Sequence, residues 1–406
     1  MKSNRNYPLL LASQFLSAFG DNAILALILG PILIQFNKHQ ITSQEQQIAN
    51  VFYTSLLFIP YVLLAPLAGY FNDRFSKNRW LIGGNVLKLA GTGIAALSIV
   101  HSPVWMAVGY FVVGIGACVY SPAKYGILPE ILPVERLVKA NGSVELLTLI
   151  AILSGTISGA MLFDKLPLTP CYIVVMCVYG ASTAMNAIMT TTPSYPDVKL
   201  RDSVGGFFQN AGDLLRNRRL ARVLMGTSIF WICGAMMKMN FQPWGQQVLN
   251  LKTATEVSLL GLWLSIGIMI GSVLAGQLYK VGDLRATRRW GWLLSSSIAV
   301  LGGVDWLTHH GLDYSRAISI TVLIIAGVIA GLFLIPLNAA LQAESHQDKL
   351  GKTIATQNGF ENLAMLAGSA IALINVSIGF DPSQLFLGLA LFVCVVTVWL
   401  NIPATH

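Results

Sequence analysis

Charged residues are scarce in this sequence. Of its 406 residues, only 11% are Asp, Glu, Lys or Arg, whereas 54% are hydrophobic. Soluble domains carry roughly 25% charged residues, so this composition excludes an ordinary soluble enzyme or binding domain. The mean hydropathy is +0.64, and apolar runs of about 20 residues recur along the chain, each long enough to cross a hydrocarbon core of ~30 Å. The sequence therefore predicts a polytopic membrane protein.

Cysteine is also sparse, and its spacing excludes a metal centre or a disulfide framework. The five cysteines occur singly inside apolar runs, at Cys118, Cys171, Cys177, Cys233 and Cys394. We interpret them as packing residues and expect neither a metal nor a cofactor. The net charge of +8 does not require a nucleic-acid partner, because the placement of the basic residues explains it.

The apolar runs divide into twelve predicted spans in two sets of six. The first set lies near 8–37, 49–71, 80–100, 104–127, 141–163 and 170–191. The second set lies near 220–247, 256–279, 290–308, 315–341, 353–377 and 382–402. We expect an all-α membrane protein built of two pseudo-symmetric six-helix bundles, with bundle domains at 1–192 and 220–406 and a polar cytoplasmic linker at 193–219.

The basic residues predict how the chain is oriented. Nineteen of the 26 Lys and Arg residues fall in the segments on the side of the N-terminus, and four fall in the opposite loops. Basic loops stay in the cytoplasm. We therefore expect a multi-pass membrane protein with both termini in the cytoplasm.

The two halves repeat each other. PLAGYFNDRF around Gly69 corresponds to VLAGQLYKVG around Gly276, and YSPAKYGILPE at 120–130 corresponds more loosely to LIPLNAALQAE at 334–344. Each motif falls at the same span of its own half. Parallel repeats of this kind are typical of secondary transporters, which bind substrate near the middle of the membrane where the repeats meet.

The loop between the second and third spans resembles the signature of the major facilitator superfamily. The signature residues are Gly69, Asp73, Arg74, Lys77 and Arg79. Gly69 would allow close helix approach, and Asp73 with the basic residues would latch helices at the cytoplasmic face. Ser76 departs from the pattern, since Gly is usual there.

Six ionisable residues lie well inside predicted spans: Asp21, Lys88, Lys124, Glu145, Lys238 and Glu361. A charge at the bilayer centre costs ~2.5–3.5 kcal/mol, so six unpaired charges would cost on the order of 15–20 kcal/mol. That exceeds the stability of a typical fold. These groups must therefore pair, face water or lose their charge.

Depth in the membrane predicts which of these charges could meet. Asp21 and Lys238 lie near the middle, and Lys124 and Glu361 lie toward the cytoplasm. We expect two gating pairs between the halves, Asp21 with Lys238 and Lys124 with Glu361. The alternative is that each charge pairs within its own half, and we favour this alternative for Lys88 and Glu145.

Amides flank these charges at Asn22, Gln357 and Asn358. They could bind a polar substrate or bond neighbouring helices. Gly155 and Gly159 in GTISG form a small-residue packing motif. This motif lacks the following Pro and paired Gly found there in proton-coupled drug exporters, which counts against an export function.

Several motifs resemble the bacterial lysophospholipid transporter family over essentially the whole chain. They are SQFLSAFGDNA at 13–23, YSPAKYGIL at 120–128, LVKANG at 137–142, GTSIFW at 226–231, PLNAALQ at 336–342 and QNGFEN at 357–362. The resemblance implies inward movement of lysophospholipids, chiefly lyso-phosphatidylethanolamine, across a bacterial inner membrane, for reacylation by a cytoplasmic acyltransferase. It also places the charges Asp21, Lys124, Lys238 and Glu361 in the substrate and gate region. The family usually has Arg where Lys238 aligns, and a lysine cannot offer a bidentate fork to a phosphate.

Two other classes remain as alternatives. An enzyme is disfavoured, because the acyltransferase signature of some relatives is a His followed five residues later by Asp, and His309, His310 and Asp313 have the wrong spacing. A proton-coupled exporter of amphipathic drugs would use Asp21 or Glu361 as the proton carrier. We expect a monomeric transporter in the lipid bilayer.

Overall fold

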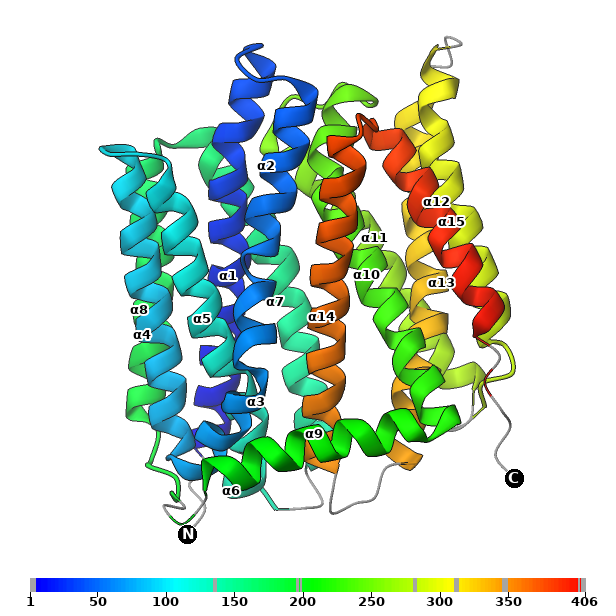
Figure 1. Ribbon diagram of the computed structural model, residues 1–406. Helices are drawn as coiled ribbons and strands as arrows, with labels where there is room; N and C mark the ends of the chain where they lie inside the picture. Colours follow the sequence, from blue (N-terminus) through cyan, green and yellow to red (C-terminus); the bar gives the residue numbers. More distant parts are fainter. Residues whose placement is uncertain are drawn as a thin grey trace. The chain divides into compact units, whose positions relative to one another are not determined.

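The structure is a computed structural model that describes residues 5–133, 137–194, 197, 199–279, 283–309, 314–344, 350–400 and 402. Within these ranges all regular secondary structure is helical (Figure 1). The helices before the linker are α1 (Asn6–Asn37), α2 (Ser43–Ser55), α3 (Phe58–Arg74), α4 (Lys77–Ala96), the short 3-10 helix η1 (Leu97–Ile99), α5 (Val104–Gly126), α6 (Leu128–Ile131), α7 (Leu137–Lys165) and α8 (Leu168–Ile188). The remaining helices are α9 (Leu200–Arg216), α10 (Arg218–Gln247), α11 (Ala254–Leu278), α12 (Thr287–His309), α13 (Ser315–Glu344), α14 (Leu350–Ser377) and α15 (Pro382–Trp399).

The predicted spans are confirmed as helices. In the part of the chain that is described, eleven helical stretches are long and apolar enough to cross a membrane. The one predicted span outside this set is α12, the ninth along the chain, which has 23 residues. Arg288 and Arg289 at its start, and Asp305 near its end, make it less apolar than the others. It packs against α13 and α15 as a span of the bundle would.

The second predicted span, 49–71, is not one continuous helix. A turn at Leu56 and Leu57 separates α2 from α3. Pro60 explains the break, because proline has no N–H to bond the carbonyl of Leu56 and its ring crowds that carbonyl. A Cβ on Gly114 of α5 would lie 3.2 Å from Pro60 Cγ and 3.3 Å from Leu56 O, so α5 packs directly against the break.

The chain forms two compact units. The first contains Met1–Pro31 and Tyr53–Phe208, and the second contains Ile32–Phe52 and Gln209–His406. The division after Phe208 falls inside the predicted linker, 193–219. Residues 32–52, which join the first predicted span to the second, group with the second unit rather than with the first.

Helix packing within the units repeats in the way the sequence repeat suggests. In the first unit α4, the third span, packs against α5 and α8. In the second unit α12, the ninth span, packs against α13 and α15. In each half, therefore, the third of the six spans packs against the fourth and the sixth. This is the pseudo-symmetry expected of the two halves.

The GTISG motif performs the predicted packing role. A Cβ on Gly159 of α7 would lie 2.6 Å from the carbonyl oxygen of Ala23 on α1. Gly155, one turn earlier, meets the backbone of Phe19 in the same way. Only glycine allows the two helix backbones to approach so closely.

The linker contains a helix that the sequence prediction missed. Residues 193–219 were expected to be a polar linker, but α9 occupies Leu200–Arg216. Its average composition is polar, while its apolar residues recur about every four positions and form one face. Asn217 then caps α10, its side chain accepting hydrogen bonds from the backbone N–H groups of Arg219 and Leu220.

Candidate functional site

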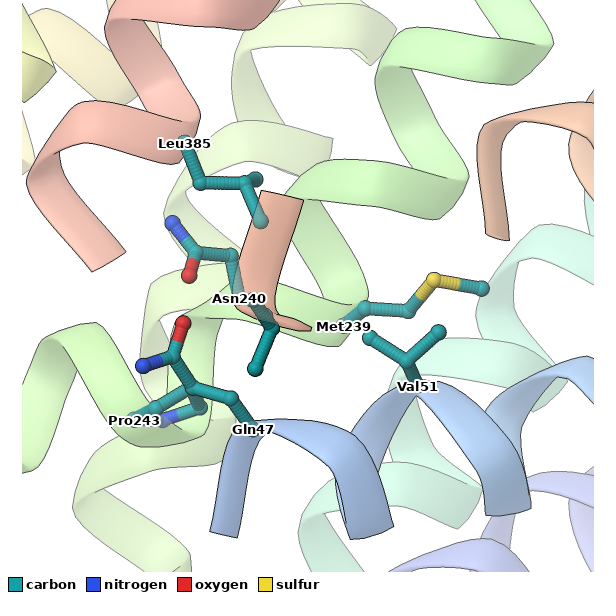
Figure 2. A pocket seen from close by; sticks show the side chains of 7 residues that line it. Gln47, Val51, Met239, Asn240, Pro243 and Leu385 are labelled. Carbon is teal, nitrogen blue, oxygen red and sulfur yellow. The ribbon is translucent and has the colours of Figure 1, made fainter. Parts of the chain in front are cut away.

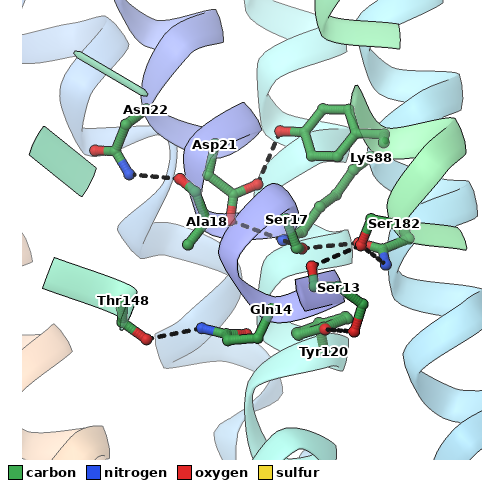
Figure 3. Close-up of polar contacts among 12 residues, drawn as sticks. Ser13, Gln14, Ser17, Ala18, Asp21, Asn22, Lys88, Tyr120, Thr148 and Ser182 are labelled. Atoms are coloured by element: carbon green, nitrogen blue, oxygen red, sulfur yellow. Dashed lines mark hydrogen bonds and ion pairs between the residues drawn. The ribbon is translucent and has the colours of Figure 1, made fainter. Parts of the chain in front are cut away.

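Asp21 of α1 forms an ion pair that is surrounded by further hydrogen bonds (Figure 3). Its Oδ2 is 2.7 Å from Lys88 Nζ of α4. Its Oδ1 accepts a hydrogen bond of 2.8 Å from the hydroxyl of Tyr179 on α8. Three helices of the first unit therefore converge on one carboxylate.

Further polar residues of the same three helices extend this ion pair into a hydrogen-bond network. Ser17, one turn before Asp21, accepts a bond of 2.7 Å from Lys88 Nζ and donates to Asn85 Oδ1 at 2.8 Å. Asn85 donates to Ser182 Oγ at 2.7 Å, and Ser182 donates to the carbonyl of Ser13. Because each donor is matched to an acceptor in a low-dielectric setting, the network fixes the three helices against one another.

Small residues make room for the charged groups. A Cβ on Gly20 would lie 2.7 Å from the Tyr179 ring, and one on Gly116 would lie 2.7 Å from Lys88 Cγ. Lys88 Nζ also lies 5.0 Å from the centroid of the Tyr120 ring, where a cation is attracted to the aromatic face. The sequence thus folds so that Lys88 reaches Asp21 through a gap that larger residues would fill.

The two members of the pair differ in accessibility. The side chain of Lys88 is 2% exposed and that of Asp21 is 16% exposed. Lys88 is therefore the enclosed partner, and the carboxylate keeps an accessible edge. An ionised carboxylate offers about four acceptor positions, so Asp21 can accept a further donor without releasing Lys88 or Tyr179.

The expected partner of Asp21 was Lys238, and the structure instead gives it Lys88 from the same half. This is the within-half alternative, and its physical reason is that Asp21 and Lys88 face each other across the α1 and α4 packing. Lys238 lies half-buried on α10, between the buried Met237 and Met239. It belongs to the second unit, and its proposed role beside Asp21 stays a prediction.

Lys124 and Glu361 also belong to different units, so their pairing stays a prediction. Lys124 is 9% exposed, with Nζ 4.7 Å from the centroid of the Tyr125 ring. Glu361 on α14 is 6% exposed and accepts a bond of 2.7 Å from Gln357 Nε2. Gln357 also donates to Asn338 of α13 at 2.8 Å, so it positions the Glu361 carboxylate between two helices.

The other two predicted amides are more accessible. Asn22 donates to the carbonyl of Ala18 on its own helix at 2.9 Å and is half-buried. Asn358 is exposed. Neither is enclosed by the hydrogen-bond network that surrounds Asp21.

The loop signature contains an ion pair whose acidic residue was not identified from the sequence. Lys77, which is 6% exposed, pairs with Glu130 of α6. Arg74 Nη1 donates to Tyr70 OH at 2.7 Å, and Arg79 is exposed. The side chains of Gly69 and Asp73 lie outside the described residues, as does that of Glu145.

A second polar cluster, also missed, joins segments of the second unit by neutral amides. Gln246 of α10 bonds Gln46 of α2 and donates to Asn37 Oδ1 of α1 at 2.8 Å. Asn37 donates to the carbonyl of Lys252 at 3.0 Å, and Gln44 donates to the carbonyl of Val376 at 3.0 Å. We call this set the amide latch. The glutamine-rich run SQEQQ at 43–47 was the sequence signal for it.

A small pocket lies beside the amide latch (Figure 2). It is lined by Gln47, Val51, Met239, Asn240, Pro243, Val376 and Leu385. Its empty space of about 170 Å³ is smaller than the ~300–1,000 Å³ of a typical ligand site. It is a gap between helices and not a site for a lipid.

Twelve helical spans in two repeated halves, with ionisable side chains inside several of them, define a secondary transporter. The comparisons with known proteins agree with this class, since the model of the Major Facilitator Superfamily matches residues 10–369. The lysophospholipid transporter LplT of Photorhabdus laumondii is 33% identical over 379 residues, covering 92% of this chain and 89% of that protein. The LplT of Klebsiella pneumoniae is 33% identical over 383 residues, covering 93% and 90%. The chain therefore belongs to the major facilitator superfamily and, within it, to the family of these LplT proteins.

Solved structures support the fold. A POT family transporter in complex with 5-aminolevulinic acid superimposes with a TM-score of 0.76 at 15% identity, covering 98% of this chain and 96% of that one. The human organic anion transporter MFSD10 (TETRAN) does so with a TM-score of 0.71 at 14% identity, covering 98% and 99%. At these identities the likeness concerns the fold alone. Family and fold together make the chain a transporter and not an enzyme.

Proposed function

We propose that this protein moves lysophospholipids, chiefly lyso-phosphatidylethanolamine, toward the cytoplasmic leaflet of a bacterial inner membrane. A cytoplasmic acyltransferase would then restore the second acyl chain. The observation that carries the proposal is the carboxylate of Asp21, which pairs with Lys88 while one edge stays accessible. The kinship with proteins named lysophospholipid transporters supports the choice of cargo.

The head group of the proposed substrate carries an ammonium and a phosphodiester. The ammonium would bind the accessible edge of Asp21 as a third partner, beside Lys88 and Tyr179. The phosphate would lie near Lys238, whose point charge attracts it without the bidentate geometry of an arginine. Asn22, Gln357 and Asn358 would supply further hydrogen bonds to the head group.

The acyl tail sets a different requirement. Moving ~16 methylenes through water would cost ~13 kcal/mol at ~0.8 kcal/mol each. The tail must therefore stay in lipid or against apolar side chains while the head group crosses. We infer a lateral opening between the two halves through which the tail remains in the bilayer.

The pair of Lys124 and Glu361 is proposed as a contact between the halves on the cytoplasmic side, formed when the transporter opens outward. Their opposite charge and similar depth support the pairing. Reversing either charge alone should abolish transport, and a Lys124→Glu/Glu361→Lys double variant should recover it. Failure of the double variant to recover, with normal amounts of protein in the membrane, would remove the gate from the proposal.

The orientation is proposed from the basic residues, with both termini in the cytoplasm. Lys38 and Lys199 are both exposed and fall on opposite predicted sides. In intact cells, a membrane-impermeant thiol reagent should label Lys38→Cys and leave Lys199→Cys unlabelled. Labelling of both, or of Lys199→Cys alone, would contradict the topology.

The function is tested by uptake into right-side-out membrane vesicles. Vesicles with the protein should take up lyso-phosphatidylethanolamine faster than vesicles without it, and lyso-phosphatidylethanolamine should reach the inner leaflet. The same vesicles are tested with an amphipathic drug, with and without a proton gradient. Drug movement driven by the gradient, without lysophospholipid movement, would identify a drug exporter and overturn the proposal.

A further inference from the structure

The linker helix α9 exposes large apolar side chains on one face. The exposed fractions are 60% for Phe208, 52% for Leu215 and 45% for Leu200. At about 100° per residue, these three positions fall within roughly 80° of one another around the helix axis, together with Val204 and Ala211. We call these five positions the α9 stripe.

A different side of α9 packs on the protein. Leu214 is 5% exposed and Asn210 is 5% exposed, and Asn210 Nδ2 donates to Thr356 Oγ1 of α14 at 3.1 Å. At about 100° per residue, the stripe begins at Leu200, about 40° around the helix from Leu214 and about 80° from Asn210. The exposed stripe is therefore beside, and not part of, the surface that packs α9 on the second unit.

Two contacts place α9 at the depth of the membrane surface. Asn217, directly after α9, caps the start of the span formed by α10. Asn210 bonds Thr356, where the apolar stretch of α14 begins. Both attachment points lie at the predicted cytoplasmic ends of spans. The axis of α9 between them therefore runs along the membrane surface and not across the bilayer.

Basic residues border the α9 stripe, whereas the exposed acidic residue Asp213 lies on the far side of the helix. Lys199, Arg201, Arg216 and Arg218 are all exposed. Arg201 falls next to the stripe, about 20° beyond Phe208 around the axis, and the other three cluster at the two ends of the helix. An exposed apolar face with basic residues at its border is the pattern of helices that lie in the head-group region of anionic membranes.

We propose that the α9 stripe docks on the cytoplasmic lipid surface, with Phe208 and Leu215 among the acyl chains and the basic residues at the anionic head groups. The partner is the bilayer itself, recognised by its negative charge and apolar interior. This anchors the connection between the two units to the membrane. The inference is independent of which substrate the transporter carries.

Spin labels on α9 test the docking directly. Labels are placed at Phe208→Cys and Leu215→Cys, with Gln209→Cys and Gly205→Cys as controls outside the stripe, about 140° and 100° around the axis from its centre. Cys177 and Cys394 are first replaced by alanine, and the three remaining cysteines are buried. Gln209 and Gly205 are exposed, and nothing lies within 4 Å of a Cβ at Gly205.

The protein is reconstituted in vesicles containing phosphatidylglycerol. Labels at 208 and 215 should collide more often with oxygen, which dissolves in lipid, than with a water-soluble nickel complex, and labels at 209 and 205 should show the reverse. In vesicles of phosphatidylcholine alone, or with Arg201→Gln/Arg216→Gln in phosphatidylglycerol, the oxygen preference at 208 and 215 should fall. Equal collision of the nickel complex with labels at 208 and 209 would overturn the proposal. An oxygen preference at 208 and 215 that changes neither with the lipid charge nor with the arginine substitutions would also overturn it.

Discussion

Replacing Lys88 by methionine removes the resident partner of Asp21 while keeping most of the side-chain volume. Lys88 Nζ contacts Asp21 Oδ2 and Ser17 Oγ, each at 2.7 Å. In Lys88→Met both contacts are lost, and Asp21 keeps only the bond from Tyr179 and its accessible edge. The carboxylate then keeps no ion-pair partner among the described residues of the first unit.

The size of the effect follows from the burial of the pair. Removing one partner of a buried ion pair costs ~3–5 kcal/mol, since it leaves an uncompensated charge. The 16% exposure of Asp21 and its bond from Tyr179 place the expected loss near the lower limit, about 3 kcal/mol. In the neutral double variant Asp21→Asn/Lys88→Met no charge remains, so it should be more stable than Lys88→Met by about 2 kcal/mol.

The assay is the free energy of unfolding of purified protein in one fixed detergent, measured for both single variants and the double variant. Lys252→Met is the control, because Lys252 is exposed and its substitution should change stability by less than ~0.5 kcal/mol. If the losses of the two single variants simply add in the double variant, Asp21 and Lys88 do not interact. The description of the site as a fixed ion pair would then be wrong.

Three further predictions concern neighbouring contacts. Tyr179→Phe should cost about 1.5–3 kcal/mol of unfolding free energy, because it removes a hydrogen bond to a charged group; no measurable loss would show that the hydroxyl does not support the carboxylate. Gly159→Val should reduce the amount of folded protein recovered from membranes, because the added side chain would meet the backbone of α1. Gly180→Ala should not reduce it, because nothing lies within 4 Å of a Cβ at Gly180. Equal recovery of the two variants would contradict the close packing of α1 and α7. Gln246→Leu breaks the amide latch and should increase labelling of Val51→Cys, a position in the adjacent pocket that is 2% exposed, by a membrane-impermeant reagent. Unchanged labelling would mean that the amide latch does not keep this region closed.

The sequence predicted the spans well because each is a long apolar run, and membrane insertion depends on summed hydropathy. It misjudged the second span because Pro60 breaks the helix without interrupting the apolar run. It missed α9 because a linker was judged by its average polarity, whereas the spacing of Leu200, Val204, Phe208 and Leu215 was the relevant signal.

The sequence identified Asp21 as a charge inside a span that needs a cation, but it did not single out Lys88 as that cation. Depth follows from counting residues along a span, whereas pairing depends on which faces of the helices meet. A signal for Lys88 was present. Ser17 and Asp21, Asn85 and Lys88, and Tyr179 and Ser182 are polar pairs at a spacing of three or four residues, so each of three helices has a polar face. Six such residues in apolar spans favour one shared network.

The relation between head-group charge and transport tests the central claim most directly. The suitable variant is Asp21→Asn/Lys88→Met, because Asp21→Asn alone would leave Lys88 buried without its partner and confuse transport with folding. Purified wild-type and double-variant proteins are reconstituted in vesicles, and the movement of lyso-phosphatidylethanolamine is compared with that of lyso-phosphatidylglycerol, which has no ammonium. We predict that the variant loses transport of the ethanolamine lipid to a much greater degree than transport of the glycerol lipid. An equal change for both lipids in a well-folded double variant would contradict the claim that Asp21 binds the ammonium of the substrate.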